Sequence, residues 1–316
     1  MNDFWLATFG DSRLTQSRKR IRIQAEKMGV FGNRIRIFSE KDLDADFCYR
    51  LRDHLVPGSR GFGYWCWKPQ VILQTMREMS EGDILLYVDI GCHLNPNGLK
   101  RLEEYRKFAI EHSIVAFQSR ALGDAARTDF NLHFLPERQW SKMDLFQHFG
   151  LANSREVLDS GQIGATVAIV QRNIRALRLI KAWRQCYYDH FELIDDSPSV
   201  LRNAPDFVEN RHDQSVFSLL CKKGGAYLLS SGEYAHIRMY MPDGGDEKLW
   251  PEYWSELKQY PVHARRDLGK YTKLVECPDW LKPILGRNGR RMASRIYEIV
   301  KPAVAFLTNK KALLKK

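Results

Sequence analysis

The sequence predicts an α/β fold in which a mostly parallel, Rossmann-like sheet is flanked by helices. Short apolar runs rich in β-forming residues recur along the chain, and segments with helical periodicity lie between them. Several runs are nearly continuous rather than alternating, which is typical of strands that are covered on both faces. The six predicted strands are Phe4–Phe9, Ile35–Phe38, Ile84–Val88, Ile114–Phe117, Ala165–Val170 and Ala226–Leu229.

The helices between these runs have recognisable starts. Pro69 suits a first helical position, and an apolar face follows as far as Met79. Asn173 is placed to cap a second helix, and His212 or Asp213 opens a third. These starts support the alternation of strand and helix.

The net charge is concentrated at one end of the chain. The 316 residues carry 49 Lys and Arg against 38 Asp and Glu, a formal charge of +11. Residues 282–316 hold ten of the basic side chains and one acid, which leaves 39 basic and 37 acidic side chains in the rest. A nearly neutral body argues against a nucleic-acid-binding protein. We therefore predict a domain at 1–280 and a separate basic tail at 281–316.

The tail has the pattern of an amphipathic helix. Apolar residues from Met292 to Leu307 share a face, interrupted at Pro302, and Arg and Lys occupy the other face. Such a segment lies in an anionic membrane surface, although a solvated closing helix would look similar. No run approaches the roughly 20 apolar residues that cross a bilayer, and no secretion signal opens the chain. Six cysteines without Cys-x-x-Cys spacing favour reduced thiols. We expect a cytoplasmic protein, peripheral at the inner face of the cell membrane.

The first candidate binding segment follows the first strand. Thr8, Phe9 and Gly10 form a small-residue turn where a ligand can approach the backbone. The turn lacks the Gly-x-Gly-x-x-Gly fingerprint, and no phosphate-loop motif occurs in the chain. The dehydrogenase and phosphate-loop classes are therefore disfavoured.

The second candidate segment surrounds Asp89. An apolar strand delivers Asp89 to its end, where a carboxylate can hold a divalent cation or cap a turn, and Gly91 leaves room for a ligand. Upstream, Lys68 stands at a helix start where it can meet a phosphate, beside Trp65 and Trp67, which can equally be core residues.

Three motifs together resemble one enzyme family. They are Tyr64-Trp65-Cys66-Trp67-Lys68-Pro69, Leu86-Tyr87-Val88-Asp89-Ile90-Gly91 and His212-Asp213-Gln214-Ser215. In this order they resemble the GT-A nucleotide-sugar glycosyltransferases of bacterial lipopolysaccharide, O-antigen and capsule synthesis. The resemblance implies a UDP-sugar donor, Mn²⁺ or Mg²⁺, and an Asp-x-Asp motif. Here the matching triplet is Asp89-Ile90-Gly91, so the second carboxylate is absent and the metal requirement stays open. Asp89 would either coordinate the metal alone, with water or another residue completing the shell, or hold the ribose instead.

The resemblance also implies roles for residues near the C-terminal half. Gln162, in a glycine-bearing turn, would contact the donor sugar, and Asp213 would act as general base, with His212 and Gln214 toward the acceptor. His263 would join Asp89 at the metal or diphosphate, and Arg265 would neutralise phosphate charge. The alternatives are an ordinary turn at Gln162, a helix cap at Asp213 and solvated surface positions for His263 and Arg265.

The favoured interpretation is a glycosyltransferase that moves a hexose such as galactose from a UDP-sugar to a lipid-linked saccharide, with inversion. Two alternatives remain at this point. The basic tail could belong to a nonenzymatic protein that binds anionic surfaces or nucleic acid, and a nucleotidyltransferase could be built on a similar sheet.

Overall fold

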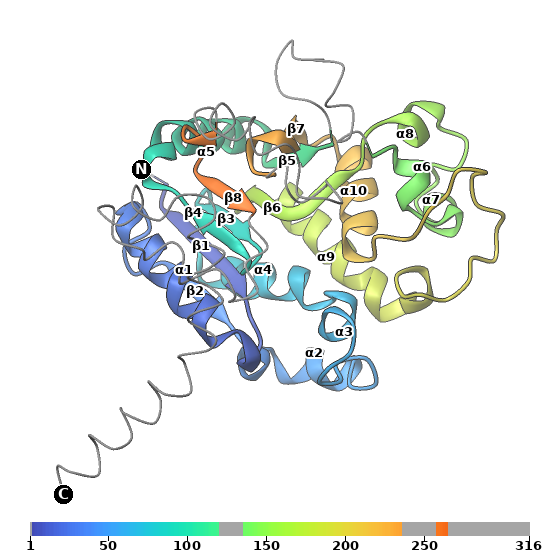
Figure 1. Cartoon of the computed structure of the whole chain (residues 1–316), viewed down its shortest axis with the longest axis horizontal. Coiled ribbons are helices and arrows are strands. Elements are labelled where there is room, and N and C mark those ends of the chain that lie inside the picture. The colour runs from blue at the N-terminus through green and yellow to red at the C-terminus, as the bar shows by residue number, and fades with distance from the viewer. Residues whose placement is uncertain (1, 120–134, 236–256, 265–316) are drawn as a thin grey trace, which may run out of the picture. The chain divides into compact units, whose positions relative to one another are not determined.

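The computed structural model describes residues 2–119, 135–235 and 257–264, which form a six-stranded sheet, a two-stranded sheet and surrounding helices (Figure 1). The order of the large sheet is β2-β1-β3-β6-β5-β7, in which β6 runs antiparallel to both neighbours and the other pairings are parallel. The predicted mostly parallel α/β fold is confirmed. The strands are β1 (Phe4–Phe9), β2 (Ile35–Phe38), β3 (Ile84–Val88), β5 (Ile114–Gln118), β6 (Ile163–Gln171) and β7 (Tyr227–Ser230).

The helix starts follow the capping signals. Asn173 accepts a hydrogen bond from the backbone N–H of Ala176 at 2.9 Å, and α10 begins at Asp213 directly after His212. α4 begins at Trp67, so Pro69 is its third residue and not its first. Proline is tolerated there because the N–H groups of the first turn have no hydrogen-bond partner within the helix. The α-helices are α1 (Thr15–Met28), α2 (Ala45–Arg50), α3 (Gly61–Tyr64), α4 (Trp67–Glu78), α5 (Leu99–His112), α6 (Glu137–Trp140), α7 (Met143–His148), α8 (Arg155–Asp159), α9 (Ile174–Asp189) and α10 (Asp213–Gly224).

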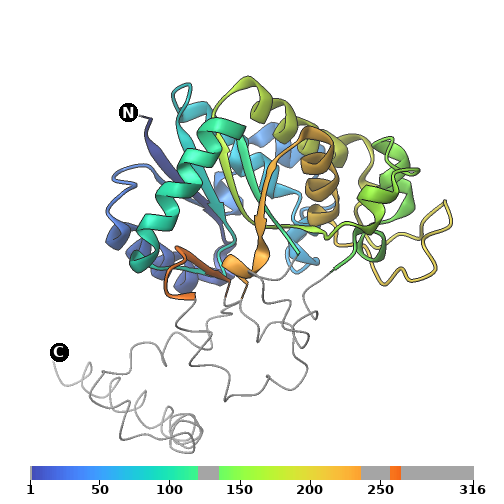
Figure 2. The same cartoon turned by 90° about the horizontal axis from the view of Figure 1, so that it is seen from above.

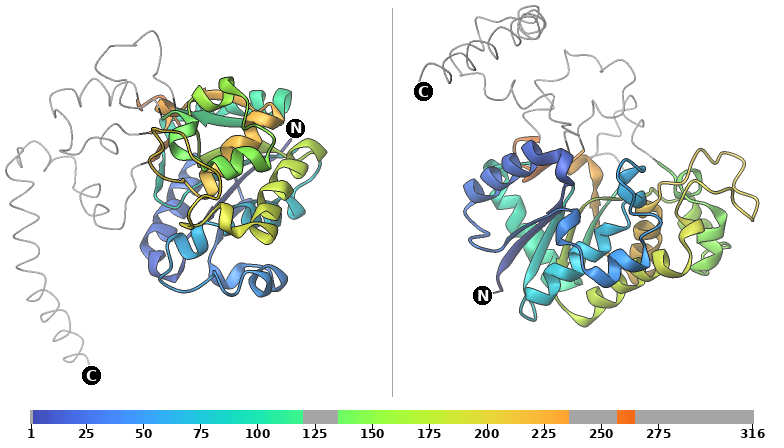
Figure 3. Two further views of the ribbon diagram at one scale, coloured as in Figure 1. Left: turned by 90° about the vertical axis from the view of Figure 1, so that its right-hand side faces the viewer. Right: turned by 90° about the horizontal axis from the view of Figure 1, so that it is seen from below.

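The large sheet has a hydrophobic core on each face. Trp5 and Ala7 belong to one core, with α4, α9 and α10, whereas Phe4 and Leu6 belong to the other, with α1 and α5. Figures 2 and 3 show these helices on the two sides of the strands. Because successive side chains of a strand point to opposite faces, two covered faces require the continuous apolar runs seen in the sequence.

The topology creates a crevice beside β1. The chain places β2 on one side of β1 and then returns to add β3 on the other side, with Ala7 opposite Tyr87. Beyond this edge, β4 (Cys92–Leu94) pairs antiparallel with β8 (Val262–Ala264). Open α/β sheets bind ligands where the strand order reverses, at the carboxyl ends of the strands.

Several sequence predictions concern other features of the chain. The boundary at 280/281 and the basic tail lie outside the described residues. Within the described ranges, no helix is both long and apolar enough to cross a bilayer. The five cysteines that the structure describes are free thiols, namely Cys48, Cys66, Cys92, Cys186 and Cys221.

Candidate active site

A cavity of about 510 Å³ opens at the carboxyl ends of β1 and β3. Its size is that of a small-molecule site. Its floor and walls come from the turns after these two strands, the α3–α4 segment and the start of α10. The lining residues are Phe9, Asp11, Arg13, Leu14, Arg60, Gly61, Phe62, Trp65, Trp67, Lys68, Asp89, Ile90, Gly91, Cys92, Thr166, Arg211, His212, Asp213, Gln214 and Ala264.

One ammonium and two carboxylates form the charged centre of the cavity. The Nζ of Lys68 lies 2.7 Å from Oδ2 of Asp213 and 3.1 Å from Oδ1 of Asp89, and it donates a hydrogen bond to the carbonyl oxygen of Ala165 at 3.2 Å. Lys68 and Asp213 are buried, whereas the Asp89 side chain is 30% exposed. The three elements α4, β3 and α10 thus meet at this trio.

Burial and charge perturb both buried members of the trio. Burial raises the pKa of Asp213 to about 6; Asp89 adds to the rise, and Lys68 opposes it. Burial would lower the pKa of Lys68, but the two carboxylates outweigh burial, so its pKa lies above the usual value. Lys68 therefore stays protonated, and Asp213 exchanges a proton close to neutral pH.

Tyr87 orients the third member. Its hydroxyl donates a hydrogen bond to Oδ1 of Asp89 at 2.9 Å. Burial, together with the negative charge of Asp89, raises the pKa of Tyr87 well above its usual value, so the phenol remains a donor. Oδ1 of Asp89 is consequently held by two groups, the phenol of Tyr87 and the ammonium of Lys68.

Aromatic rings form one wall of the cavity. Phe9 stacks on Trp67 with ring centroids 4.0 Å apart, and on Phe62 at 6.2 Å. The indole N–H of Trp67 donates to the carbonyl oxygen of Gly61 at 3.0 Å. Trp67 is buried, Trp65 is partly buried, and both line the cavity, so core packing and cavity lining are combined in this segment. Aromatic faces suit a nucleobase or a sugar ring.

The backbone beneath this wall is strained. Five consecutive residues, 61–65, have φ between +52° and +84°, and three of them are the non-glycine residues Phe62, Tyr64 and Trp65. A left-handed conformation costs a non-glycine residue about 1–2 kcal/mol. Strain of this kind persists where surrounding contacts hold it and is concentrated at functional sites.

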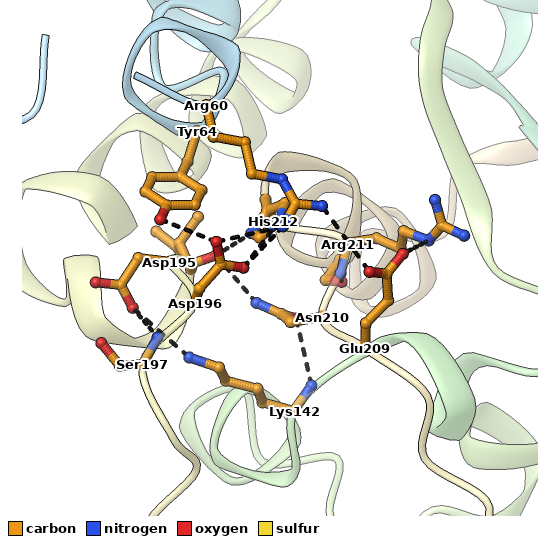
Figure 4. A network of polar contacts seen from close by, with 12 residues as sticks. Arg60, Tyr64, Lys142, Asp195, Asp196, Ser197, Glu209, Asn210, Arg211 and His212 are labelled. Carbon is orange, nitrogen blue, oxygen red and sulfur yellow. Dashed lines mark hydrogen bonds and ion pairs between the residues drawn. The ribbon is translucent and has the colours of Figure 1, made fainter. Parts of the chain in front are cut away.

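A network of charged side chains borders the cavity beside His212 (Figure 4). Asp196 accepts hydrogen bonds from Arg60 at 3.0 Å and from the hydroxyl of Tyr64 at 3.0 Å. Nδ1 of His212 lies 2.6 Å from the carbonyl oxygen of Ile194, and burial lowers the pKa of His212. His212 also has φ +54° and ψ −117°, a strained conformation directly before Asp213.

The structure brings most of the predicted site residues together. Seven of them line the cavity: Phe9, Lys68, Asp89, Gly91, His212, Asp213 and Gln214. Thr8 is fully buried, and Gly10 lies behind the lining, where a Cβ would come within 3.0 Å of Ile90. Arg265 lies outside the described residues.

The structure places Gln162, the predicted sugar contact, outside the cavity lining. Gln162 is 1% exposed and does not line the cavity, because its side-chain amide donates to the carbonyl oxygen of Trp140 and lies in a buried network around Glu137. Its carbonyl oxygen accepts a hydrogen bond from Gln214 at 2.6 Å. Gln162 thus reaches the cavity only through its hydrogen bond with Gln214, which does line it.

The structure also places His263, the expected partner of Asp89 at a metal, outside the cavity lining. His263 is buried in β8 opposite His93, and its Nε2 lies 2.8 Å from the carbonyl oxygen of Leu257, away from the cavity lining. In the described part of the chain, no three His, Cys, Asp or Glu side chains are grouped so that they could hold a metal ion.

The sequence interpretation missed several polar lining residues. Asp11, Arg13, Arg60, Thr166 and Arg211 line the cavity without having been singled out. Arg60 lies four residues before the motif that begins at Tyr64, and Arg211 directly precedes His212, so their positions beside selected motifs were a usable signal. Thr166 lies inside an apolar strand, where no pattern distinguishes it.

Comparison with solved structures finds glycosyltransferases of low sequence identity. A glycosyltransferase involved in the glycosylation of the major capsid of PBCV-1 is 11% identical, with a TM-score of 0.42 over 84% of this chain and 97% of that one. Mouse xyloside xylosyltransferase 1 is 10% identical, with a TM-score of 0.40 over 83% and 97%. The galactosyltransferase LgtC, solved with donor and acceptor sugar analogs, is 12% identical, with a TM-score of 0.41 over 82% and 85%.

No protein-family model matches the chain, and no curated protein matches it in sequence.

Proposed function

We propose that this chain is a glycosyltransferase that moves a hexose from a UDP-sugar to a lipid-linked saccharide. The observation that carries the proposal is the cavity in which Asp213, at the start of α10, faces the carboxyl ends of β1 and β3 beside an aromatic wall and three arginines. The resemblance of the three motifs supports the nucleotide-sugar donor. The basic amphipathic pattern of residues 281–316 supports a membrane-bound acceptor and a peripheral location.

The cavity offers the groups that a direct displacement requires. Asp213 takes the proton of the acceptor hydroxyl while the acceptor oxygen bonds to the anomeric carbon. The bond from that carbon to the nucleoside diphosphate breaks, and the released diphosphate carries away the negative charge. Arg13, Arg60 and Arg211 line the same cavity and supply positive charge to the leaving group. A single displacement inverts the configuration at the anomeric carbon.

A screen of nucleotide sugars tests this function. The full chain is incubated with UDP-, GDP-, CMP- and dTDP-sugars, and the melting temperature and the released nucleotide are measured. A donor at 100 times its Kd stabilises the fold by about 2.7 kcal/mol. We expect a UDP-sugar to raise the melting temperature and, with a lipid-linked acceptor, to yield UDP and an inverted product. Absence of a shift with every donor would reject the proposal, and release of pyrophosphate would identify a nucleotidyltransferase instead.

A further inference from the structure

The ammonium of Lys68 is fully engaged by protein oxygens. Three acceptors surround it: Asp213 at 2.7 Å, Asp89 at 3.1 Å and the carbonyl oxygen of Ala165 at 3.2 Å. A lysine ammonium has three N–H donors, and it donates hydrogen bonds to Asp89 and to Ala165 while its shortest contact is the ion pair with Asp213. Only 3% of Lys68 is exposed. Lys68 is therefore a fixed internal cation rather than a mobile side chain that could follow a substrate.

The position of this ammonium bears on the Mn²⁺ or Mg²⁺ that the family resemblance implies. A divalent ion of this kind is held by carboxylate oxygens at about 2.0–2.2 Å. The two carboxylates of the cavity centre, Asp89 and Asp213, converge instead on the Nζ of Lys68. Tyr87 engages Asp89 as well. The described residues of the cavity centre thus do not fit a divalent ion while Lys68 is in place.

We propose that the Lys68 ammonium takes the position between Asp89 and Asp213 that a divalent cation would otherwise fill, so that glycosyl transfer in this cavity needs no divalent metal. The statement about transfer rests on the proposed function, whereas the statement about the cation position rests on the geometry. Removing Lys68 would leave two carboxylates facing each other, which is the arrangement that attracts a hard divalent cation.

Charge balance in the cavity agrees with this role. Two carboxylates and one ammonium leave the trio with a net charge of −1, which offers nothing to a diphosphate. The positive charge for a diphosphate comes instead from the arginines of the lining. Arg13 pairs with Asp11 at 2.6 Å and Arg60 with Asp196 at 3.0 Å, and both arginines are substantially exposed. Exposed ion pairs are weak and can exchange a carboxylate for a phosphate.

Mn²⁺ binding tests the proposal without any sugar donor. Free Mn²⁺ is measured by electron paramagnetic resonance during titration of the wild type, Lys68→Ala and Lys68→Ala/Asp213→Asn. We expect no specific binding of Mn²⁺ to the wild type. Lys68→Ala should bind one Mn²⁺ with a Kd at least tenfold lower than that of any weak, nonspecific binding to the wild type, and the double variant should lose this site. Lys142→Ala is the matched control, because Lys142 is also 3% exposed but lies 3.8 Å from its nearest carboxylate, Asp195; it should gain no site.

Two outcomes would overturn the proposal. One is specific Mn²⁺ binding to the wild type that Asp89→Asn abolishes, and the other is a folded Lys68→Ala that gains no Mn²⁺. If Lys68→Ala does not fold, release of UDP by the wild type in EDTA and in Mn²⁺ decides. Equal rates support the proposal, and a rate that requires Mn²⁺ overturns it while leaving the proposed transfer intact. Conversely, if no nucleotide sugar is turned over but Lys68→Ala gains Mn²⁺, the proposed function fails and the cation position stands.

Discussion

Lys68→Met is expected to lower the free energy of unfolding by about 3 kcal/mol at pH 8, because breaking a buried ion pair leaves an uncompensated charge. The expected loss is at the lower end of the range for such pairs, since the Asp89 side chain is 30% exposed and remains partly solvated. Asp213, with 6% of its side chain exposed, bears most of the penalty. Urea unfolding followed by circular dichroism measures the change.

The loss should depend on pH in a defined direction. Asp213 already has a folded-state pKa of about 6, above its ordinary value of 3.8, and removal of Lys68 raises that pKa further. A carboxyl with a raised folded pKa contributes stability below its unfolded pKa and loses that contribution as pH rises through the folded pKa. The deficit of Lys68→Met should therefore be small at pH 4 and grow from there to pH 8.

Two variants control this experiment. Lys68→Met/Asp213→Asn removes the buried charge together with its partner and should recover most of the lost stability. Lys142→Met replaces an equally buried lysine whose nearest carboxylate is 3.8 Å away, so its deficit should vary little with pH. If Lys68→Met shows the same pH-independent deficit as Lys142→Met, the ammonium is not balancing the two carboxylates.

Asp213→Asn is expected to reduce the rate of hexose transfer by about 10²–10⁴-fold, the usual contribution of a general base. Asparagine keeps the shape of the side chain and cannot accept the hydroxyl proton at neutral pH, so the affinity for the nucleotide should stay near that of the wild type. Steady-state release of UDP and calorimetric titration with UDP measure the two quantities separately.

The pH profile gives a second signature of the same base. Asp213 must be ionised to accept a proton, so the wild-type rate should fall about tenfold per pH unit below its pKa of about 6. Asp46→Asn is the matched control, because Asp46 also lies in the first turn of a helix, α2, but its side chain is 75% exposed. Full transfer by Asp213→Asn, or an unchanged acid limb in that variant, would remove Asp213 as the base.

The sequence predicts the sheet well because each strand carries its own signal. Burial on both faces requires nearly continuous apolar runs, so the strands Phe4–Phe9 and Ile84–Val88 are visible locally and confirmed with the same bounds. Asp89 and Asp213 are visible for a related reason. Each is a carboxylate at the end of a buried strand or the start of a buried helix, and the topology of open sheets makes such ends converge.

The part that the sequence does not predict depends on contacts between distant segments. Lys68 precedes Asp89 by 21 residues and Asp213 by 145, and no local pattern indicates that its ammonium lies between them. Gln162 shows the opposite case, because its glycine-bearing turn gives a local signal that suggests a ligand contact. The turn says nothing of the side chain's direction, and Gln162 points into the hydrogen-bonded network around Glu137.

The central claim is that the cavity at the ends of β1 and β3 is the donor site. Calorimetric titration of UDP into the wild type, Thr166→Trp and Val200→Trp tests it most directly. Thr166 lines the cavity, whereas Val200 is 92% exposed and elsewhere on the surface. We expect equal Kd values for the wild type and Val200→Trp and at least tenfold weaker binding by folded Thr166→Trp. Equal binding of UDP by all three proteins, or no binding by the wild type, would contradict it.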